Sequence, residues 1–431
     1  MKKLFVVVLV IGLFVVNVPA GLSQEQIVLT FETSVYVEEP HKNAIDALIE
    51  TYNQKNPNVK IEVYGAGYAD FWNNLTTEVM AGNEADIVQV YTENIATYNA
   101  LRPGGAFVEL DSFMGGTNLA ENLVAQEFCV VDGKTLALSN YAWGTTGIFY
   151  RKSMFEAAGI DPASLKTWDD FVAASAKLTT GNQAAMGILA SSHAFVISEY
   201  NRLLGRVVSN GLYFPDGESG PYTADRIQTN NEANVWAAKQ WQEYMKKYGK
   251  PVPDKKDSRE LFWNGHVAIN FDGPWFIGMS ASKDEAVVND IGLMPQPAVV
   301  YNGKTYKPNP SVYPLVAMIS KKSAHPEEAW KFLEWMAGEE AQALIAQCGM
   351  IPSNKTYASS ESYTSSYQMG GLFNEFLANN YATPVSDPQI PQLGELTQIM
   401  IDAAQEMFVG GADVQATLDD AAERLKDVMS R

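Results

Sequence analysis

The chain has 431 residues, with 50 acidic and 31 basic side chains and a formal net charge of −19 at pH 7. Such an acidic surface argues against nucleic acid or an anionic membrane as the partner. The length exceeds what one ordinary hydrophobic core holds, so we expect two domains.

The first twenty residues have the pattern of a secretory signal peptide. Lys2 and Lys3 precede an apolar run over residues 4–16, and residues 18–20 supply small side chains for cleavage. The run is too short for a membrane helix, and no later stretch approaches the ~20 apolar residues that such a helix needs. We therefore expect an exported protein, periplasmic or at the cell surface and soluble after cleavage behind residue 20 or, as second choice, behind Ser23.

The two cysteines, Cys129 and Cys348, lie far apart in the sequence. In an oxidising compartment they could form one disulfide, or both could remain buried free thiols. The sequence leaves both possibilities open.

The amino-terminal part of the chain alternates strands and helices. Strands are predicted over residues 27–31, 59–64 and 86–91, because each is rich in β-branched and apolar side chains. The first intervening helix starts at Pro40, and Asp70 is expected to cap the second. Two consecutive βαβ units predict a parallel sheet whose strands end at one shared edge.

Polar and aromatic side chains follow each of these strands at that edge. Ligands of open α/β sheets bind beyond the carboxyl ends of the strands, so these side chains are candidate ligand contacts. The candidates are Thr33 and Glu38 after the first strand, Tyr68 and Asp70 after the second, and Tyr91 and Glu93 after the third.

A strand predicted over residues 267–271 leads directly into Asp272-Gly273-Pro274-Trp275. Asp-Gly is a turn signal, and Pro274 suits the first position of a helix. The turn delivers Asp272 and Trp275 together at a helix N-terminus, which favours ligand binding in an α/β domain. Core packing of Trp275 and helix capping by Asp272 explain the same pattern, so both interpretations stay open.

Three segments have the character of crossings between domains. Residues 143–147 place small side chains inside an extended apolar stretch, and residues 312–320 form a predicted return strand. Residues 350–353 form a third such segment. Trp143 and Tyr313 lie in the first two of these segments and are further candidate ligand contacts.

The remaining elements are mostly helical. Thr167 and Asp170 have the spacing of a capping box. Further helices are predicted over residues 230–248, from His325 onward, over 393–408 and over 414–429, and residues 304–310 are predicted to form an exposed turn.

The sequence lacks the motifs of common enzyme classes, such as His-Glu-x-x-His or Gly-x-Ser-x-Gly. The four scattered histidines are expected at the surface or as helix caps. A pair of carboxylates such as Glu38 and Glu93 can always be chosen from 50 acidic residues, so it does not indicate a glycosidase. We expect no catalytic activity, no cofactor and no metal.

Aromatic rings beside carboxylates suit a carbohydrate, because sugar rings present apolar faces to aromatic rings and hydroxyls to planar polar groups. Five aromatic residues recur at predicted strand ends or crossings: Tyr68, Tyr91, Trp143, Trp275 and Tyr313. Six other tryptophans fall within helical stripes and are expected in the core: Trp72, Trp168, Trp236, Trp241, Trp330 and Trp335.

Four stretches in order resemble the family 1 extracellular solute-binding proteins of ABC importers, the group that is similar to the maltose-binding protein. They are residues 132–134 with 149–152, 155–160 and 166–171; Phe262 and residues 264–265 leading into 271–275; residues 323–330 with 340–342; and Gly349-Met350-Ile351-Pro352. The chain departs from the family pattern at Ser139, where Pro is frequent, at Arg151, where Asn is usual, and at Tyr313, near a frequent Gly pair.

The resemblance implies an α/β fold of two lobes, the type II periplasmic-binding-protein fold. Each lobe is a mostly parallel sheet flanked by helices, and three crossings form the hinge. It implies residues 21–143 plus 316–349 in the first lobe and residues 144–315 plus 350–431 in the second, after a signal peptide over 1–20.

The resemblance also implies a function. Trp275 would stack on a sugar, and Tyr91 and Glu93 would contact it from the first lobe. The protein would be a monomer that delivers a carbohydrate to the permease subunits of an ABC transporter. A cationic ligand such as a polyamine and, less favoured, an exported glycoside-acting enzyme stay open as alternatives.

Overall fold

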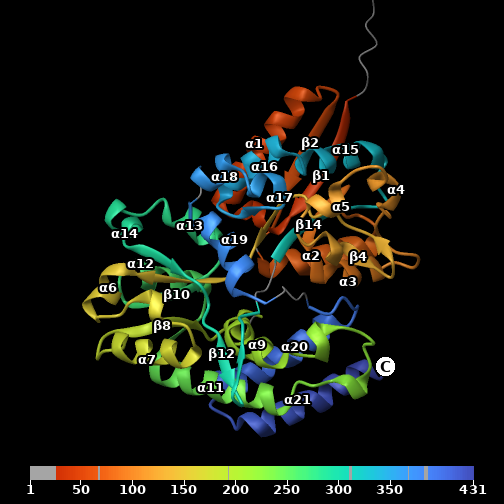
Figure 1. Cartoon of the computed structure of the whole chain (residues 1–431). Helices are drawn as coiled ribbons and strands as arrows, with labels where there is room; N and C mark the ends of the chain where they lie inside the picture. The colour runs from red at the N-terminus through yellow and green to blue at the C-terminus, as the bar shows by residue number, and fades with distance from the viewer. Residues whose placement is uncertain (1–25, 67, 193, 310–312, 367, 383–386) are drawn as a thin grey trace, which may run out of the picture.

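The computed structural model describes residues 26–431 apart from 67, 193, 310–312, 367 and 383–386. The predicted signal peptide therefore lies outside the described residues. Two lobes, each built on its own β-sheet with helices around it, lie one above the other in Figure 1. This is the two-lobe α/β fold that the sequence predicts.

The first lobe contains a six-stranded sheet of order β15-β6-β14-β3-β1-β2. Its strands are β1 (Ile27–Thr33), β2 (Val59–Tyr64), β3 (Ile87–Tyr91), β6 (Ala142–Gly144), β14 (Tyr313–Ile319) and β15 (Ile351–Pro352). β1 pairs in parallel with β2 and β3, as the two βαβ units predict. β14 returns antiparallel to β3, which confirms the predicted return strand.

The second lobe contains a five-stranded sheet of order β11-β7-β10-β8-β9. Its strands are β7 (Gly147–Arg151), β8 (Ala184–Leu189), β9 (Gly249–Val252), β10 (Val267–Asp272) and β11 (Ile291–Met294). β8 pairs in parallel with β9 and β10, whereas β7 is antiparallel to β10 and β11. Every residue of β10 is buried, so this strand lies at the centre of its lobe.

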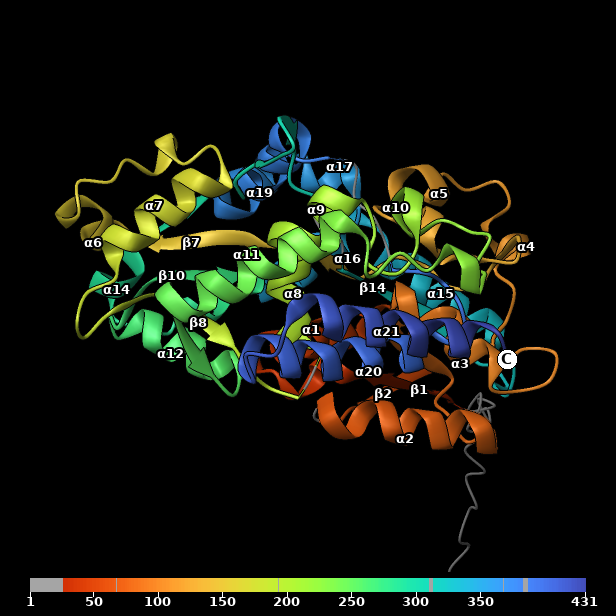
Figure 2. The same cartoon turned by 90° about the horizontal axis from the view of Figure 1, so that it is seen from below.

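Helices cover the faces of both sheets (Figures 1 and 2). The first lobe carries α1 (Glu39–Lys55), α2 (Tyr68–Ala81), α3 (Ile95–Ala100), α4 (Asp111–Met114), α5 (Leu119–Asn122), α15 (Pro326–Met336) and α16 (Glu339–Ile345). The second carries α6 (Lys152–Ala157), α7 (Trp168–Leu178), α8 (Phe195–Tyr200), α9 (Arg206–Ser209), α10 (Pro215–Glu218), α11 (Glu232–Tyr248), α12 (Lys255–Trp263), α13 (Trp275–Ser280), α14 (Glu285–Asn289), α20 (Leu393–Ala404) and α21 (Val414–Met429). Among these described helices, none is long and apolar enough to cross a membrane.

Three strands lie side by side where the lobes join. Trp143 of β6 pairs with Pro314 of β14 on one side and with Ile351 of β15 on the other. From β15 the chain continues into α17 (Lys355–Ala358), α18 (Glu361–Ser366) and α19 (Gln368–Asn380). These strands coincide with the three predicted crossings, while the exact division of the chain at residues 143, 315 and 349 stays a prediction.

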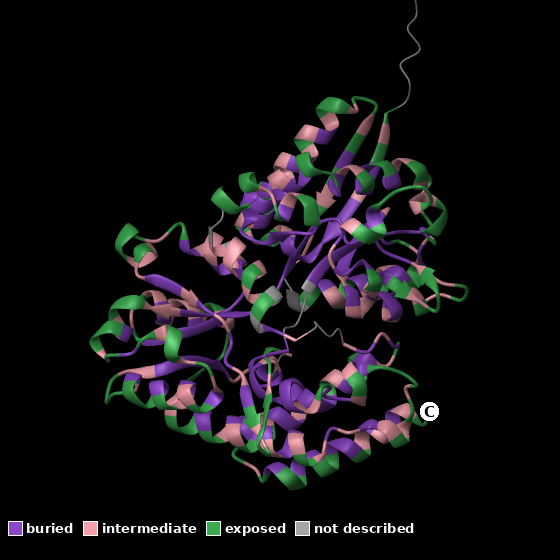
Figure 3. Ribbon diagram, viewed as in Figure 1, coloured by how far each residue is buried: buried purple, intermediate pink, exposed green. Residues whose placement is uncertain are grey.

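The core is continuous across this hinge. Figure 3 shows the central strands of both sheets as buried, among them β3 and β10, with exposed residues on the outer helices. One apolar cluster joins Trp143 and Ile351 of the hinge strands to Phe149 and Phe276 of the second lobe, whose rings lie 4.7 Å apart. Apolar packing therefore stabilises the hinge itself.

Several local predictions are confirmed. Both halves of the capping box at Thr167 and Asp170 are present. α11, α20 and α21 cover the predicted carboxyl-terminal and central helical segments, and Figure 2 shows α20 and α21 as neighbours. Trp168 and Trp241 are buried, as expected from their helical stripes.

Three local predictions are wrong. Of the predicted turn over residues 304–310 the structure describes 304–309, and Lys304–Tyr306 form β13, which makes a hairpin with β12 (Val299–Tyr301) around Asn302-Gly303, both with positive φ. α2 starts at Tyr68, so Asp70 lies in its first turn and does not cap it. His41 is buried instead of exposed, and its Nδ1 lies 3.0 Å from the hydroxyl of Tyr141.

The two cysteines do not form a disulfide in this structure. Cys129 and Cys348 are both buried free thiols. Burial raises the pKa of the Cys348 thiol to about 12, so it stays protonated at neutral pH.

Candidate interlobe binding site

The edge of the first sheet contributes Thr33 and Tyr91 from the ends of β1 and β3. Thr33 is buried, and its hydroxyl donates to Oε1 of Gln89 at 2.7 Å, so it ties two strands together. Tyr91 is half-buried, with its ring centre 6.0 Å from that of Trp72. At this edge Tyr91 is therefore the better placed of the two for contact with a ligand.

Glu93 follows β3 and faces charged groups of the second lobe. Burial and the carboxylate of Asp387 raise the pKa of Glu93 to about 7, against the attraction of Arg202 and Arg206. These three partners belong to chain segments of the second lobe, so their influence on Glu93 acts between the lobes. The predicted contact Glu93 is thus close enough to these charged groups for them to shift its pKa.

Trp275 is the first residue of α13 and is half-buried. Its indole Nε1 donates to Oδ1 of Asp272 at 2.6 Å. A Cβ added to Gly273 would lie 2.2 Å from the ring, so the ring rests directly on this glycine. The turn after β10 therefore fixes both the position and the orientation of the indole.

Asp272, which accepts from the indole of Trp275, is itself fixed by several further hydrogen bonds. It accepts from Nε of Arg259 at 2.8 Å, from Nη2 of Arg259 at 3.2 Å and from the backbone N–H of Gly273 at 2.9 Å. Burial would raise the pKa of Asp272, but the charges of Arg259 and Lys255 and these hydrogen bonds hold it below its usual value. Asp272 positions Trp275, and its oxygens are already engaged without a ligand.

Trp275 also touches the hinge. A Cβ added to Gly144 of β6 would lie 2.3 Å from Cζ3 of the indole. Gly144 belongs to the first sheet, whereas Gly273 follows a strand of the second. The indole therefore bridges the two lobes at their junction, where only a residue without a side chain leaves it room.

Trp143 lies beside Gly144 but does not share its face of the strand, because successive strand residues point to opposite faces. It is buried with 4% of its surface exposed and lines a different cavity.

The remaining predicted contacts lie at the starts of helices and strands. Glu38 is half-buried at the start of α1, and Asp70 is exposed. Tyr68 and Tyr313 begin α2 and β14, and their side chains lie outside the described residues.

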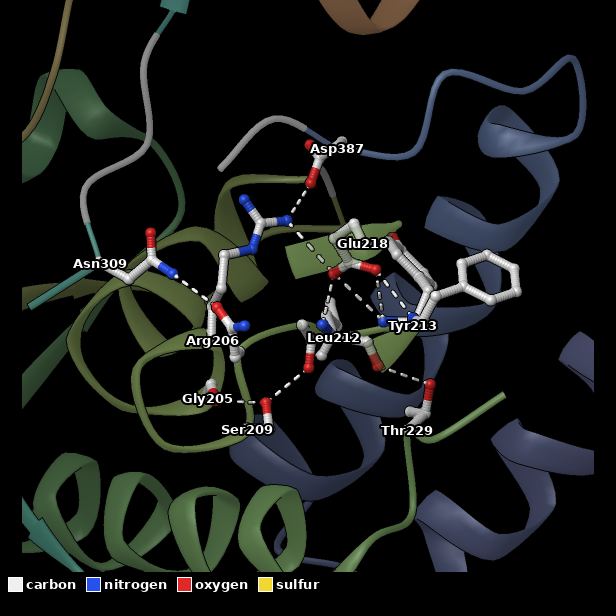
Figure 4. A network of polar contacts seen from close by, with 12 residues as sticks. Gly205, Arg206, Ser209, Leu212, Tyr213, Glu218, Thr229, Asn309 and Asp387 are labelled. Carbon is white, nitrogen blue, oxygen red and sulfur yellow. Dashed lines mark hydrogen bonds and ion pairs between the residues drawn. The ribbon is translucent and has the colours of Figure 1, made fainter. Parts of the chain in front are cut away.

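The second lobe adds a network of charges that the sequence analysis missed (Figure 4). Arg206 forms ion pairs with Asp387 and with Glu218, the latter at 3.6 Å. Burial opposes the charge of Arg206, yet these two carboxylates keep its pKa above the usual value. In the sequence, this charge network could have been suspected from two arginines four residues apart, Arg202 and Arg206, within an apolar stretch.

Glu218 is fixed from two directions. Besides facing Arg206, it accepts from the backbone N–H groups of Leu212, Tyr213 and Phe214, the last at 2.8 Å. Burial raises the pKa of Glu218 to about 7, against the attraction of Arg206. Glu218 is therefore the buried carboxylate that pairs with Arg206, whereas the carboxylate of Asp387 is partly exposed.

A cavity of about 670 Å³ borders this network. Its walls come from both lobes, with Glu127 and Phe128 on one side and Asp216, Tyr222 and Asp387 on the other. Gln389 of the second lobe also donates to the carbonyl of Phe128 at 2.5 Å. None of the eight predicted contacts whose side chains the structure describes lines this cavity, although the charge of its border residue Asp387 raises the pKa of Glu93.

The structure thus brings Glu93 within electrostatic range of Arg206 and Asp387, and it places Trp275 at the junction of the lobes. Thr33 and Asp272 serve the scaffold, and Trp143 belongs to another cavity. Arg151, a departure from the family pattern, pairs with Asp290 at 2.6 Å and donates to two carbonyls of α12. Among the described residues, no group of three or more His, Cys, Asp or Glu could hold a metal ion.

Comparisons with known proteins agree with this architecture. Residues 38–343 match the family model described as bacterial extracellular solute-binding protein. An ABC transporter extracellular-binding protein of Pyrococcus horikoshii is 27% identical over 333 residues, covering 73% of this chain and 69% of the relative. The arabinooligosaccharide-binding protein of Bacillus subtilis is 24% identical over 407 residues, covering 88% of each. The maltose-bound MalE3 structure of T. maritima superposes with a TM-score of 0.78 at 15% identity, covering 93% of this chain and 100% of that one.

Proposed function

Because this chain belongs to the bacterial extracellular solute-binding protein family, we propose that it captures a carbohydrate between its lobes and delivers it to the permease of an ABC transporter. The observation that carries the proposal is Trp275, an aromatic ring held by Asp272 and resting on the hinge strand. An aromatic ring beside hydrogen-bonding groups suits the apolar face and the hydroxyls of a sugar.

The proposed mechanism is hinge closure. A ligand that touches both lobes binds the closed state more tightly than the open one, so it shifts the equilibrium toward closure. Glu93 and the Arg206–Asp387 network would supply polar contacts from opposite lobes, and Trp275 would supply the stacking surface. The chain would act as an exported monomer, and the permease would recognise its closed form.

The relatives support a carbohydrate as the ligand class. The B. subtilis relative is named for an arabinooligosaccharide, and the T. maritima structure holds maltose. Carried over to this chain, these names favour a neutral sugar or a short oligosaccharide over other solutes.

A thermal-shift panel of mono- and oligosaccharides tests the ligand class. A molecule that binds only the native state raises the melting temperature in proportion to RT ln(1 + [L]/Kd). We expect at least one neutral sugar to give a saturable rise whose size hardly changes between 20 and about 300 mM salt, since no ion pair with the ligand is screened.

Two outcomes would contradict the proposal. A rise with spermidine alone, lost at high salt, would favour a cationic ligand. Breakdown of a bound oligosaccharide on prolonged incubation would make the protein an enzyme.

A further inference from the structure

One face of α12 carries three hydrogen-bond donors, Lys255, Ser258 and Arg259. Ser258 and Arg259 lie three and four residues after Lys255, so the three side chains share one face of the helix. α12 packs against β8 and β10, and this face is turned inward, because Ser258 is buried and the two basic residues are half-buried. We call these three side chains the donor face of α12.

The donor face meets the last three residues of β10, just before the turn that leads to Trp275. Nζ of Lys255 donates to the carbonyl of Phe271. Oγ of Ser258 shares its proton between Oδ1 of Asn270 at 3.2 Å and the carbonyl of Gly187 in β8 at 3.1 Å. The helix is thus tied by polar contacts to the end of the strand.

Arg259 holds Asp272, the last residue of β10, by two hydrogen bonds. Nε donates to Oδ2 at 2.8 Å and Nη2 donates to Oδ1 at 3.2 Å. The two side chains are only 16% and 1% exposed, so the pair is largely shielded from water. A planar guanidinium that donates twice fixes the orientation of a carboxylate as well as its place. This orientation points Oδ1 of Asp272 at the indole of Trp275, which donates to it at 2.6 Å.

The acceptor capacity of Asp272 is fully used inside the protein. Besides Arg259 and Trp275, the backbone N–H of Gly273 donates to it at 2.9 Å and Nδ2 of Asn270 donates to it at 3.2 Å. An ionised carboxylate offers only about four lone-pair sites. A sugar hydroxyl therefore finds no acceptor site on Asp272, and this carboxylate influences a ligand through the position of Trp275.

We propose that Arg259 is the positioning residue for the ring of Trp275 and that it acts through Asp272 without touching the ligand. The guanidinium fixes the carboxylate, and the carboxylate fixes the indole N–H and with it the plane of the ring. Lys255 and Ser258 hold the strand end from which this chain of contacts starts. The inference rests on the proposed sugar site, because Trp275 is the ring proposed to stack on the sugar.

Arg259→Lys separates positioning from simple charge balance. Lysine keeps the positive charge beside Asp272 but has no planar pair of donors. Arg102→Lys is the matched control in the first lobe. Arg102 pairs with Glu84 at 2.6 Å, and the two side chains are 14% and 0% exposed, so the control perturbs an equally buried ion pair that does not involve Asp272.

The indole N–H of Trp275 reports its bond to Asp272 directly and without any sugar. In protein labelled with 15N at its nine tryptophans, Trp275→Phe identifies the indole signal that belongs to Trp275. We expect Arg259→Lys to speed hydrogen exchange of this N–H about tenfold, as the weakening of one charged hydrogen bond would, and Arg102→Lys to leave it unchanged. The indole of Trp263, which lies on α12 and donates to Ser280 at 3.0 Å, should keep its exchange rate.

Three results would overturn the proposal. They are an unchanged exchange rate of Trp275 in folded Arg259→Lys, an equal acceleration in Arg102→Lys, and an equal acceleration of Trp263, which would mean that Arg259 only holds α12 in place. If Arg259→Lys does not fold, Ser258→Ala takes its place, because it removes one hydroxyl of the donor face and no charge. We then expect exchange a few-fold faster for Trp275 alone, and an unchanged rate would again overturn the proposal.

Calorimetry with maltose separates this proposal from the proposed function. We expect the Kd for maltose to rise about tenfold in Arg259→Lys and to stay unchanged in Arg102→Lys. Equal affinities in the two folded variants would overturn the proposal. If the unchanged protein binds neither maltose nor any other sugar of the thermal-shift panel, the proposed function fails, whereas the exchange rate of the indole still decides whether Arg259 positions the ring.

Discussion

Replacing Gly144 by Ala tests whether the indole of Trp275 rests on the hinge. The added Cβ would lie 2.3 Å from Cζ3 and 3.0 Å from Cε3 of the ring, whereas carbon atoms in contact normally keep about 3.5 Å. The ring would have to move by about 1 Å. It is pressed against Gly273 on one side and bonded through Nε1 to Asp272, so it has little room to yield. Overpacking of this kind costs about 1–3 kcal/mol.

Urea unfolding and sugar titration measure the effect of Gly144→Ala. Gly181→Ala is the matched control, because a Cβ there meets nothing within 4 Å and Gly181 is exposed. Both substitutions reduce the freedom of the unfolded chain alike, so their difference isolates the clash. We expect Gly144→Ala to lose about 1–3 kcal/mol of unfolding free energy relative to the control and to bind sugar more weakly. Equal stability and equal affinity in the two variants would refute the contact.

Three further predictions concern stability and are measured by urea unfolding. Burial and Glu78 raise the pKa of Glu32 from 4.5 to about 8, so its contribution to stability is full below pH 4.5 and falls as the pH rises to 8. Glu32→Gln should therefore stabilise the protein on the order of a few kcal/mol more at pH 8 than at pH 4.5, and a pH-independent difference would contradict this. Asp272→Ala removes a buried carboxylate that pairs with Arg259 and accepts from the indole of Trp275, and it should cost about 3–5 kcal/mol, so a loss below about 1 kcal/mol would speak against these contacts. Thr167→Ala removes the cap of α7 and should cost about 1 kcal/mol, and no loss would mean that the cap is not formed in solution.

The regular elements follow from the sequence because their signals are local. Residues 59–64 form β2 as predicted, and residues 414–429 form α21. The spacing of apolar residues that distinguishes a strand from a helix can be recognised within such a short segment. The hairpin at Asn302-Gly303 also had a local signal, the dipeptide that favours tight hairpin turns.

The candidate site could be predicted only in part, because its contacts join distant segments. The pairing of Arg206 with Asp387 spans 181 positions. The packing of Trp275 on Gly144 likewise depends on how two sheets meet. The pattern of Asp272 suggested a helix cap or a ligand contact. Asp272 accepts a hydrogen bond from the indole nitrogen of Trp275 and pairs with Arg259. The pairing with Arg259 depends on how α12 packs against β10, which the local sequence does not determine.

The affinity for sugar of Trp275→Ala, compared with that of Trp263→Ala, tests the central claim most directly. Both indoles are half-buried in the second lobe and donate to a side-chain oxygen, Trp263 to Ser280 at 3.0 Å. Only Trp275 touches the hinge. The claim that Trp275 anchors a carbohydrate between the lobes predicts a loss of about 2 kcal/mol or more in binding for Trp275→Ala, roughly thirtyfold in Kd, and little change for Trp263→Ala. Equal affinities in the two folded variants would contradict it.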